Sequence, residues 1–454
     1  MIHKFCQNGY YIVLDVASGA VHNVDEVAYD ILDYFETKEL PEIIDTLTGK
    51  HSRSDIEEAY AELSELLKNE LLYSKDEYEN FLPALDGRKP VIKALCMHIA
   101  HDCNLKCTYC FAGEGEYHNL GVRSLMSGET GKKAIDFLVA NSGARRNLEI
   151  DFFGGEPTIN FGVVKEIVEY ARSIEAASGK NFRFTLTTNG VLLNNEMIEY
   201  VNKTMHNVVL SIDGRKETND RMRKNAGGGG SYDLIVPKFL KLAESRNQTN
   251  YYVRGTFTRH NLDFASDVLH LADLGFKQIS VEPVVGAPSL DYTLREEDLP
   301  LIFDEYDKLA VKLLEYEDRG KGFNFFHFMI DLTGGPCVIK RMVGCGAGTE
   351  YLSVTPDGDL YPCHQFTGLD GFKIGTVDDG LTAHELRKSF AGANVYSKPE
   401  CRKCFARFYC SGGCAANAFM AQGGILKQYE IGCALQKKRL ECALMLKVAA
   451  EEKD

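Results

Sequence analysis

The most informative stretch of this 454-residue chain is Cys103-Asn104-Leu105-Lys106-Cys107-Thr108-Tyr109-Cys110-Phe111. It carries three cysteines at the spacing Cys-x3-Cys-x2-Cys, with an aromatic residue on each side of the last one. Three thiolates in one short loop would hold three irons of a [4Fe–4S] cluster and leave the fourth iron without a protein ligand. Such an open iron can bind a substrate or cofactor, whereas a fully ligated cluster only passes electrons. The alternatives are a zinc site or a set of buried thiols, although a zinc motif normally joins a CxxC pair to a distant second pair.

Length and composition describe an ordinary globular protein of two to four domains, with 44% hydrophobic and 26% charged residues. The net charge of −14 argues against a nucleic-acid partner, because phosphate binding relies on clustered Lys and Arg. The sequence shows neither a signal peptide nor a stretch of membrane-spanning length, so we expect a cytoplasmic protein. Thiols stay reduced there, and metal clusters therefore explain fourteen cysteines better than disulfides do. Such clusters are sensitive to oxygen, which favours an anaerobic organism.

Residues 1–85 are expected to form a separate domain, followed by a linker at residues 81–93. Two β-rich runs, Tyr10–Asp15 and Ala20–Val24, form a predicted hairpin, and two amphipathic helices follow, the second with a capping box that starts at Ser54. This order resembles the winged-helix-like recognition element (RRE) of peptide-modifying enzymes, which binds a precursor's leader by adding it as a strand to a sheet edge. The alternative is a plain structural cap on the next domain.

Residues 92–290 alternate predicted strands with predicted helices. Six βα units in a row predict a parallel sheet with right-handed crossovers, best described as an open, partial (β/α)6 TIM-like barrel in an α/β protein. In such a sheet the chemistry lies at the carboxyl ends of the strands. The six expected strands are Val91–Ile99, Leu148–Phe153, Phe182–Thr188, Asn207–Ile212, Tyr251–Thr258 and Gln278–Val284.

The polar and glycine-rich segments all fall at the ends of these predicted strands. The cysteine loop follows the first strand, Gly154-Gly155-Glu156-Pro157 the second, and Thr187-Thr188-Asn189-Gly190 the third, while Ser211-Ile212-Asp213-Gly214 ends the fourth. A pair of glycines lets the backbone approach a ligand closely, and Glu156 offers a carboxylate to a cationic amine. We therefore expect one binding site at this rim of the sheet.

In this form the cysteine loop resembles the signature of the radical S-adenosylmethionine (SAM) enzymes. In that family the open iron chelates the amino and carboxylate groups of SAM, and an electron splits SAM to give a 5′-deoxyadenosyl radical. The resemblance implies that the GGEP-type segment receives the SAM amino group and that Ser211 contacts its ribose or carboxylate. Arg254 either pairs with the SAM carboxylate or forms a salt bridge inside the barrel, and Asn189 and Asp213 are either ligands or turn residues. The expected cofactor-binding residues are Tyr109, Gly154, Gly155, Glu156, Pro157, Thr188, Asn189, Ser211, Asp213 and Arg254.

A second group of cysteines lies near the C-terminus, and its order resembles the SPASM extension of radical SAM enzymes. That extension carries two auxiliary [4Fe–4S] clusters, which would give this chain three clusters in all. We assign it to residues 337–454, with residues 291–336 as a helical bridge from the barrel. The resemblance implies an outer cluster on Cys401, Cys404, Cys410 and Cys433 and an inner cluster on Cys345, Cys363 and Cys414.

The inner cluster lacks a fourth ligand in this assignment. Cys337, eight residues before Cys345, could fill the place. Otherwise the open iron could bind a thiolate of the substrate and hold its sulfur beside a carbon radical. Both readings stay open. The separate cysteines Cys6, Cys96 and Cys442 are interpreted as buried structural thiols.

The chain as a whole resembles the maturases of six-cysteine (SCIFF) peptides, most clearly in residues 98–117, 148–153, 251–256 and 361–366. That family joins a cysteine sulfur of a ribosomal precursor peptide to a threonine carbon and so forms a thioether. The resemblance implies a cysteine-rich precursor whose leader binds the N-terminal domain, together with an external electron donor of the flavodoxin or ferredoxin type. The alternatives are an anaerobic sulfatase-maturing enzyme, a carbon–carbon crosslinking peptide maturase, and a three-cluster electron-transfer protein. The last of these leaves the residues at the strand ends unexplained.

Overall fold

An antiparallel sheet of three strands opens the chain, in the order β1 (Ile2–Gln7), β2 (Tyr10–Asp15) and β3 (Val21–Val24). The computed structural model describes residues 1–86, 91–117, 123–332 and 337–453. The turn between β1 and β2 is Asn8-Gly9, and both residues have positive φ angles of 52° and 84°. This pair suits a two-residue hairpin because Asn and Gly tolerate the left-handed region best. The hairpin of β2 and β3 was predicted, but β1 was not.

Helices α1 (Glu26–Ile31), α2 (Leu40–Leu47) and α3 (Arg53–Lys68) complete the N-terminal unit. They bury their apolar residues against Val13 on one face of the sheet, whereas Ile12 and Leu14 on the other face join the main core. The predicted cap of α3 at Ser54 is wrong by two residues. Ser52 has the extended backbone of an N-cap residue, and its hydroxyl accepts a hydrogen bond from the backbone N–H of Asp55.

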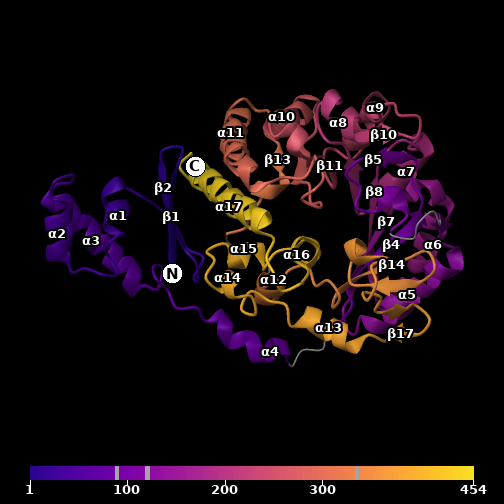
Figure 1. Cartoon of the computed structure of the whole chain (residues 1–454), viewed down its shortest axis with the longest axis horizontal. Coiled ribbons are helices and arrows are strands. Elements are labelled where there is room, and N and C mark those ends of the chain that lie inside the picture. Colours follow the sequence, from indigo (N-terminus) through magenta and orange to yellow (C-terminus); the bar gives the residue numbers. More distant parts are fainter. Residues whose placement is uncertain (87–90, 118–122, 333–336, 454) are drawn as a thin grey trace.

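The expected linker is partly helical, with a 3₁₀ turn at Tyr78–Phe81 followed by α4 (Leu82–Asp86). Its residues 87–90 lie outside the described part of the chain. Figure 1 shows the N-terminal unit at one end of the molecule, with α4 running below the C-terminal segments toward the barrel.

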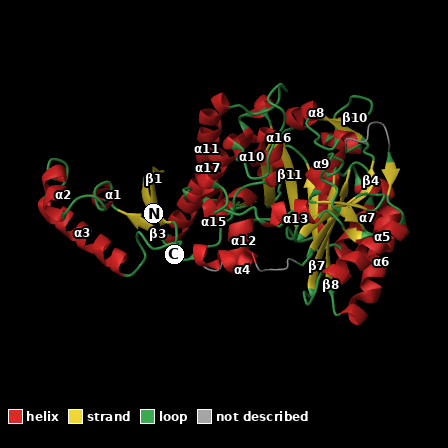
Figure 2. Ribbon diagram, turned by 60° about the horizontal axis from the view of Figure 1, so that its bottom comes forward, coloured by secondary structure: helices red, strands yellow, loops and turns green. Residues whose placement is uncertain are grey.

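The predicted parallel sheet is confirmed, and its six strands stand side by side in chain order. Each strand begins or ends within three residues of the expected position. Parallel neighbours need a crossover, and the helices that supply it cover one face of the sheet (Figure 2). The strands are β4 (Ala94–His101), β7 (Asn147–Gly154), β8 (Asn181–Thr188), β9 (Asn207–Ser211), β11 (Tyr251–Phe257) and β12 (Gln278–Pro283).

Side-chain alternation explains how these strands lie between the helices and the interior of the barrel. Along β8, Phe182, Phe184 and Leu186 are fully buried, whereas the residues between them are half-buried. In β4 every residue is buried, as expected for the strand with neighbours on both sides and layers on both faces. The crossover helices are α5 (Gly128–Asn141), α6 (Phe161–Ser178), α7 (Asn195–Thr204), α8 (Lys216–Met222), α9 (Tyr232–Ser245) and α10 (Phe264–Asp273), and α11 (Leu299–Asp318) follows β12.

The C-terminal region, residues 337–453, is joined to the barrel sheet through its own strands. Strand β14 (Tyr351–Val354) pairs in parallel with β4, and β15 (Asp359–Tyr361), β16 (Gly375–Thr376) and β17 (Gly380–Leu381) extend the sheet further. At the opposite end β13 (Asn324–Phe325) pairs with β12. The remaining helices are α12 (Val338–Val343), α13 (His384–Ala391), α14 (Pro399–Arg402), α15 (Arg407–Cys410), α16 (Ala415–Gln422) and α17 (Glu430–Glu451).

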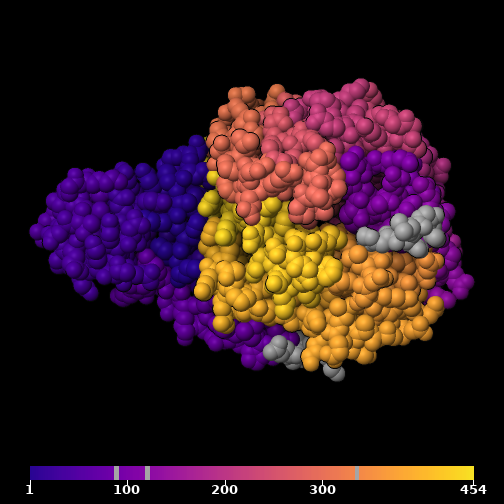
Figure 3. Space-filling model, in the orientation of Figure 1, coloured from indigo at the N-terminus to yellow at the C-terminus, as the bar shows by residue number. Residues whose placement is uncertain are grey.

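Helix α17 lies between the N-terminal sheet and α11, so the C-terminal region occupies the centre of the molecule (Figures 1 and 3). Two further short pairings complete the strands: β5 (Leu105–Cys107) pairs with β10 (Arg223–Asn225), and β6 (Ser124–Leu125) pairs with the end of β4.

A search of the described helices finds none with the length and apolar character needed to cross a bilayer.

The N-terminal unit is held against the C-terminal region through Asp76. Its carboxylate accepts hydrogen bonds of 2.8 and 2.9 Å from the Tyr396 hydroxyl and forms an ion pair of 2.8 Å with Arg407. The Arg407 side chain is only 6% exposed, so its charge is largely removed from solvent. Nearby, the rings of Tyr78 and Phe408 pack with their centroids 4.7 Å apart.

The substitution Asp76→Ala should loosen this contact, because it leaves the buried Arg407 without its carboxylate. A hydrogen bond to a charged group contributes about 1.5–3 kcal/mol, and we expect a loss of stability in that range. The matched control is Glu79→Ala, which removes an ion pair with Arg402 whose partners are about half exposed; it should cost about 0–1 kcal/mol. Thermal unfolding and hydrogen exchange of residues 74–82 measure the difference. Equal exchange in both variants would contradict this account of the contact.

Candidate functional site

The three cysteines of the loop after β4 line one cavity of about 280 Å³ at the carboxyl ends of the barrel strands. All three are free thiols of intermediate exposure. The loop is anchored by Leu105, which is 1% exposed, and by the antiparallel pairing of β5 with β10, which sets Arg223 opposite Cys107. The segment that carries the cysteines is therefore held in place by side-chain packing and by strand pairing.

The Gly154-Gly155-Glu156 segment is hydrogen-bonded directly to the chain that leads into the cysteine loop. The backbone N–H of Gly155 donates to the carbonyl of Ala100, and that of Glu156 donates to the carbonyl of Asp102, each at 2.8 Å. A Cβ atom on Gly155 would lie 2.1 Å from the Asp102 oxygen, and Gly154 has a φ of +128°. Only glycine fits both positions, which explains the pair physically.

Glu156 is a buried carboxylate that joins this segment to the end of β8. One carboxylate oxygen accepts from the backbone and hydroxyl of Thr158 and from the Thr188 hydroxyl, and the other accepts from the backbone N–H of Asn189 at 2.7 Å. Burial raises the pKa of Glu156, and these hydrogen bonds oppose the rise. The oxygen bonded to Asn189 accepts a single hydrogen bond among those described, so it can accept another from a ligand donor.

Asn189 connects the third strand's end to the cysteine loop. Its side-chain amide donates to Asn104 at 2.7 Å and to the Cys103 sulfur at 3.7 Å, and the backbone N–H of Leu105 points at the same sulfur from 3.5 Å. Two N–H groups aimed at one sulfur fit a thiolate that serves as a cluster ligand, because outer donors of this kind orient such ligands. The donor set at this loop therefore suits an iron–sulfur cluster.

Asp213 lies outside the cavity wall, behind Tyr109. The Tyr109 hydroxyl donates to both Asp213 oxygens at 2.8 and 2.7 Å and accepts from Arg223 at 2.7 Å. Burial raises the pKa of Asp213 to about 6, and the Arg223 guanidinium opposes the rise. Asp213 thus braces the ring of Tyr109, which does line the cavity.

Arg223 is a site residue that the sequence analysis missed. It is 8% exposed, lines the cavity and stands 3.7 Å from an Asp213 oxygen. It occurs in the charged run Arg221-Met222-Arg223-Lys224, which offers no signal of burial. Only the pairing of β10 with β5 brings this guanidinium beside the cysteines.

Arg254 and Glu282 also line the cavity. Arg254 forms a salt bridge of 3.2 Å to Glu282, which is one of the two alternatives that the sequence left open, and its half-exposed side chain lines the cavity together with Ser211. Although burial raises the pKa of Glu282, His327 and Arg254 bring it below its usual value. Of the expected cofactor-binding residues, Pro157 and Asp213 lie outside the wall, and the cavity is lined by Tyr109, Gly154, Gly155, Glu156, Thr188, Asn189, Ser211 and Arg254.

The second cysteine group is gathered around two further pockets. The four cysteines expected to hold an outer cluster, Cys401, Cys404, Cys410 and Cys433, line one cavity of about 720 Å³. Within the described ranges no three His, Cys, Asp or Glu side chains are placed to hold a single metal ion.

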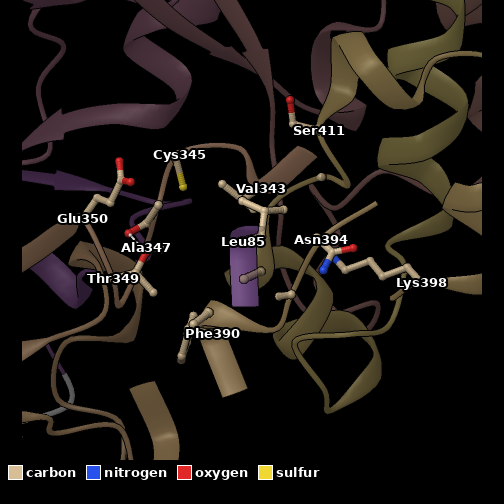
Figure 4. A pocket seen from close by; sticks show the side chains of 15 residues that line it. Leu85, Val343, Cys345, Ala347, Thr349, Glu350, Phe390, Asn394, Lys398 and Ser411 are labelled. Carbon is tan, nitrogen blue, oxygen red and sulfur yellow. Dashed lines mark hydrogen bonds between the residues drawn. The ribbon is translucent and has the colours of Figure 1, made fainter. Parts of the chain in front are cut away.

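Cys345 lines the second pocket, shown in Figure 4. Burial raises the pKa of Cys363 to about 12, and Cys414 and Cys345 contribute to the rise. Cys337 is exposed at the N-cap of α12 and does not line this pocket.

The C-terminal region also supplies part of the first cavity. His364 and Gln365, which directly follow Cys363, line it together with Asn417. The His364 ring lies 5.5 Å from the ring of Phe111 and 5.2 Å from that of Phe153. The wall that faces the cysteine loop is therefore built from the segment that carries the second cysteine group.

Comparison with known sequences agrees with this geometry. The Radical SAM superfamily matches residues 97–267. The uncharacterized protein MJ0907 of Methanocaldococcus jannaschii is 30% identical over 289 residues, which cover 63% of this chain and 90% of that protein. The cysteine-type anaerobic sulfatase-maturating enzyme of Clostridium novyi (strain NT) is 25% identical over 346 residues, 72% of this chain and 89% of that enzyme. The chain belongs to the radical SAM superfamily, which implies a [4Fe–4S] cluster and SAM.

Solved structures share the fold. Native anSMEcpe with bound AdoMet aligns with a TM-score of 0.65 at 21% identity and covers 79% of this chain and 99% of its own. Streptococcus suis SuiB bound to precursor peptide SuiA aligns with a TM-score of 0.52 at 16% identity over 93% of this chain and 96% of its own. The α/β fold with a central parallel sheet is therefore common to all three proteins.

The substitution Gly155→Ala should disturb the site, because its Cβ would meet the backbone oxygen of Asp102 at 2.1 Å. We expect a loss of about 1–3 kcal/mol, as for an overpacked position, together with less iron bound per chain. The control is Gly162→Ala in α6, where nothing lies within 4 Å of the added Cβ. It should be neutral or slightly stabilising. The measurements are the unfolding temperature and the iron content per chain. Unchanged iron binding in Gly155→Ala would contradict the claim that the site needs this close approach.

The substitution Arg223→Gln should loosen the cysteine loop, because Tyr109 and the buried Asp213 lose their cation. We expect a cost of about 1.5–3 kcal/mol and faster hydrogen exchange in residues 103–111. Arg221→Gln is the matched control, since Arg221 is exposed and donates only to the His260 carbonyl among the hydrogen bonds described. If both variants exchange at the wild-type rate, Arg223 does not support the loop.

Proposed function

We propose that this radical SAM enzyme installs a thioether between a cysteine sulfur and a threonine carbon of a ribosomal, cysteine-rich precursor peptide. One observation carries the proposal. The cavity lined by Cys103, Cys107 and Cys110 is also lined by His364 and Gln365, the residues next to Cys363. A candidate ligand of the inner auxiliary cluster thus adjoins the place where a substrate C–H bond would be attacked.

The cavity residues suit the binding of SAM. Cys103, Cys107 and Cys110 would hold the SAM-binding cluster, and the free acceptor position of Glu156 would receive the SAM ammonium group. Ser211 and Arg254 line the same cavity and would contact the ribose and the carboxylate of SAM. Arg254 would then leave its ion pair with Glu282 and bind the SAM carboxylate. The bound cluster and SAM supply a hydrogen-abstracting 5′-deoxyadenosyl radical, and the auxiliary clusters supply an acceptor for the remaining electron. The protein itself orients the reactants and excludes water.

The reaction balances as a two-electron oxidation of the peptide. A C–S bond forms while one C–H bond and one S–H bond break. The hydrogen atom of the C–H bond goes to the deoxyadenosyl group, the thiol proton goes to solvent, and the last electron leaves the peptide. Each crosslink therefore removes two hydrogens from the substrate.

We assign two auxiliary [4Fe–4S] clusters to the C-terminal region. The outer one would use Cys401, Cys404, Cys410 and Cys433, which share a cavity. The inner one would use Cys345, Cys363 and Cys414. Cys337 is separated from Cys345 by the intervening helix α12, an arrangement that favours a substrate thiolate over Cys337 as the fourth ligand.

The N-terminal unit is proposed to bind the leader of the precursor. Strand β3 pairs with β2 on one side, and within the described residues its other edge has no strand partner, so it can accept a leader strand. SuiB, whose structure holds a precursor peptide, shares the fold over the same length of chain. The electron that starts the reaction would come from a protein of the flavodoxin or ferredoxin type.

Anaerobic incubation of the reconstituted protein with SAM, dithionite and a cysteine-rich precursor peptide tests the proposal. We expect 5′-deoxyadenosine and a peptide lighter by two hydrogens per crosslink, with one cysteine per crosslink lost to alkylation by iodoacetamide. Cys110→Ala should give neither product, because the cluster loop loses a ligand. A peptide of unchanged mass from protein with intact clusters would rule the thioether out.

An anaerobic sulfatase-maturing activity is the second candidate, and the 25% identical relative in Clostridium novyi supports it as well. The same assay separates the two with a core peptide that lacks the leader. A leader-dependent thioether synthase should fail on it, whereas a sulfatase-type enzyme should oxidise one Cys or Ser at an undiminished rate. A carbon–carbon crosslinking enzyme would instead give the mass loss while every thiol still reacts with iodoacetamide.

A further inference from the structure

Lys398 is a lysine buried between the two groups of C-terminal cysteines. It is 3% exposed, although lysine is rarely buried unless it is paired. Its ammonium group donates a hydrogen bond of 2.7 Å to the carbonyl oxygen of Gly412. Among the described residues no carboxylate lies within ion-pair distance of it. A positive charge therefore sits in the interior with a backbone dipole as its partner.

The carbonyl that Lys398 contacts belongs to a turn that joins the two cysteine groups. Gly412 lies between Cys410, assigned to the outer cluster, and Cys414, assigned to the inner one. Ser411, Gly412 and Gly413 all have left-handed backbones, with φ angles of 57°, 85° and 76°. The two glycines adopt this conformation without strain, whereas Ser411 carries a Cβ that disfavours it, so a contact that holds the turn offsets the cost at Ser411. The ammonium of Lys398 provides that contact.

Lys398 also adjoins both groups through its own position in the chain. It is the residue before α14, which carries Cys401, and its carbonyl accepts from the backbone N–H of Arg402. Its side chain lines the pocket of Cys345, and Figure 4 shows the two residues on opposite sides of that pocket. Glu350, the carboxylate that lines the same pocket, forms an ion pair with Lys93.

The position of Lys398 relates it to both cysteine groups. Its ammonium contacts the carbonyl of Gly412, which lies two residues after Cys410 of the outer group and two residues before Cys414 of the inner group. Its side chain also lines the pocket of Cys345. One ammonium is thus placed to act on both candidate clusters.

We propose that Lys398 is a positioning residue whose ammonium braces the turn Ser411–Gly413 and biases both auxiliary clusters toward their reduced states. The inference rests on the proposed function, because it takes these clusters as given. A thiolate-ligated cluster becomes more negative when it gains an electron. A fixed cation at low dielectric therefore stabilises the reduced form more than the oxidised form. Such a bias suits an acceptor for the electron that thioether formation releases.

The test is an anaerobic redox titration followed by electron paramagnetic resonance on the full-length protein and its variants. Lys398→Met and Lys398→Gln should lower the midpoint potentials of both auxiliary clusters. We expect at least a tenfold fall in the ratio of reduced to oxidised cluster, which is about 59 mV for a one-electron couple. Lys398→Arg should stay near the wild type. The matched control is Lys403→Met, an exposed lysine beside Cys404 whose charge is screened by solvent; it should shift the potentials less.

Iron content separates the possible failures. Wild-type protein with about four irons per chain, one cluster rather than three, would overturn both the auxiliary-cluster assignment and this inference. Wild-type protein with about twelve irons and unchanged potentials in Lys398→Met and Lys398→Gln would overturn the role of Lys398 alone. Loss of auxiliary iron in both neutral variants but not in Lys398→Arg would support the bracing role. Equal loss in all three variants would contradict it, since the arginine keeps the charge.

Discussion

Two backbone hydrogen bonds, from Gly155 to Ala100 and from Glu156 to Asp102, hold the end of β7 against the end of β4. They are possible only because no Cβ stands between the two segments. This contact brings the Glu156 carboxylate to the rim, where it fastens the end of β8 in turn. The cysteine loop, the glycine segment and the third strand's end thereby form one surface around a single cavity. The positions of Glu156, Thr188 and Asn189, which are assigned to SAM binding, depend on that close approach.

The parallel pairing of β14 with β4 has a comparable effect on the second cysteine group. Because β14 adds to the barrel sheet at its first strand, the segment that follows it turns over the mouth of the barrel and places His364 in the cavity wall. The segment next to Cys363 thereby lines the cavity of the first cysteine loop. At the far side of the same region, Asp76 fastens the N-terminal unit to Arg407. The N-terminal unit and the outer cysteine group therefore belong to one continuous body of protein.

Much of the barrel could be predicted because its signals are local. Hydrophobic alternation in β7 and β8, and polar segments after each strand, depend on neighbours in the sequence. The misses have local causes too. Strand β1 was overlooked although Asn8-Gly9 marks a hairpin, and the start of α3 was placed at Ser54 although Ser52 has the extended backbone of a cap. Asp213 illustrates a different limit, since its position behind Tyr109 depends on a hydroxyl more than a hundred residues away in the chain.

The sequence by itself determined the chemistry: cysteines at ligand spacing, glycines where the backbone must approach closely, and strands in an order that allows a parallel sheet. These properties depend on residue type and short-range spacing, so they can be read along the chain. Only the tertiary structure decided which charges are buried. Arg223 and Lys398 each occur among other charged or polar residues and look like solvent-exposed side chains in the sequence. They became site residues because distant segments cover them, and burial is what gives a single charge its strength.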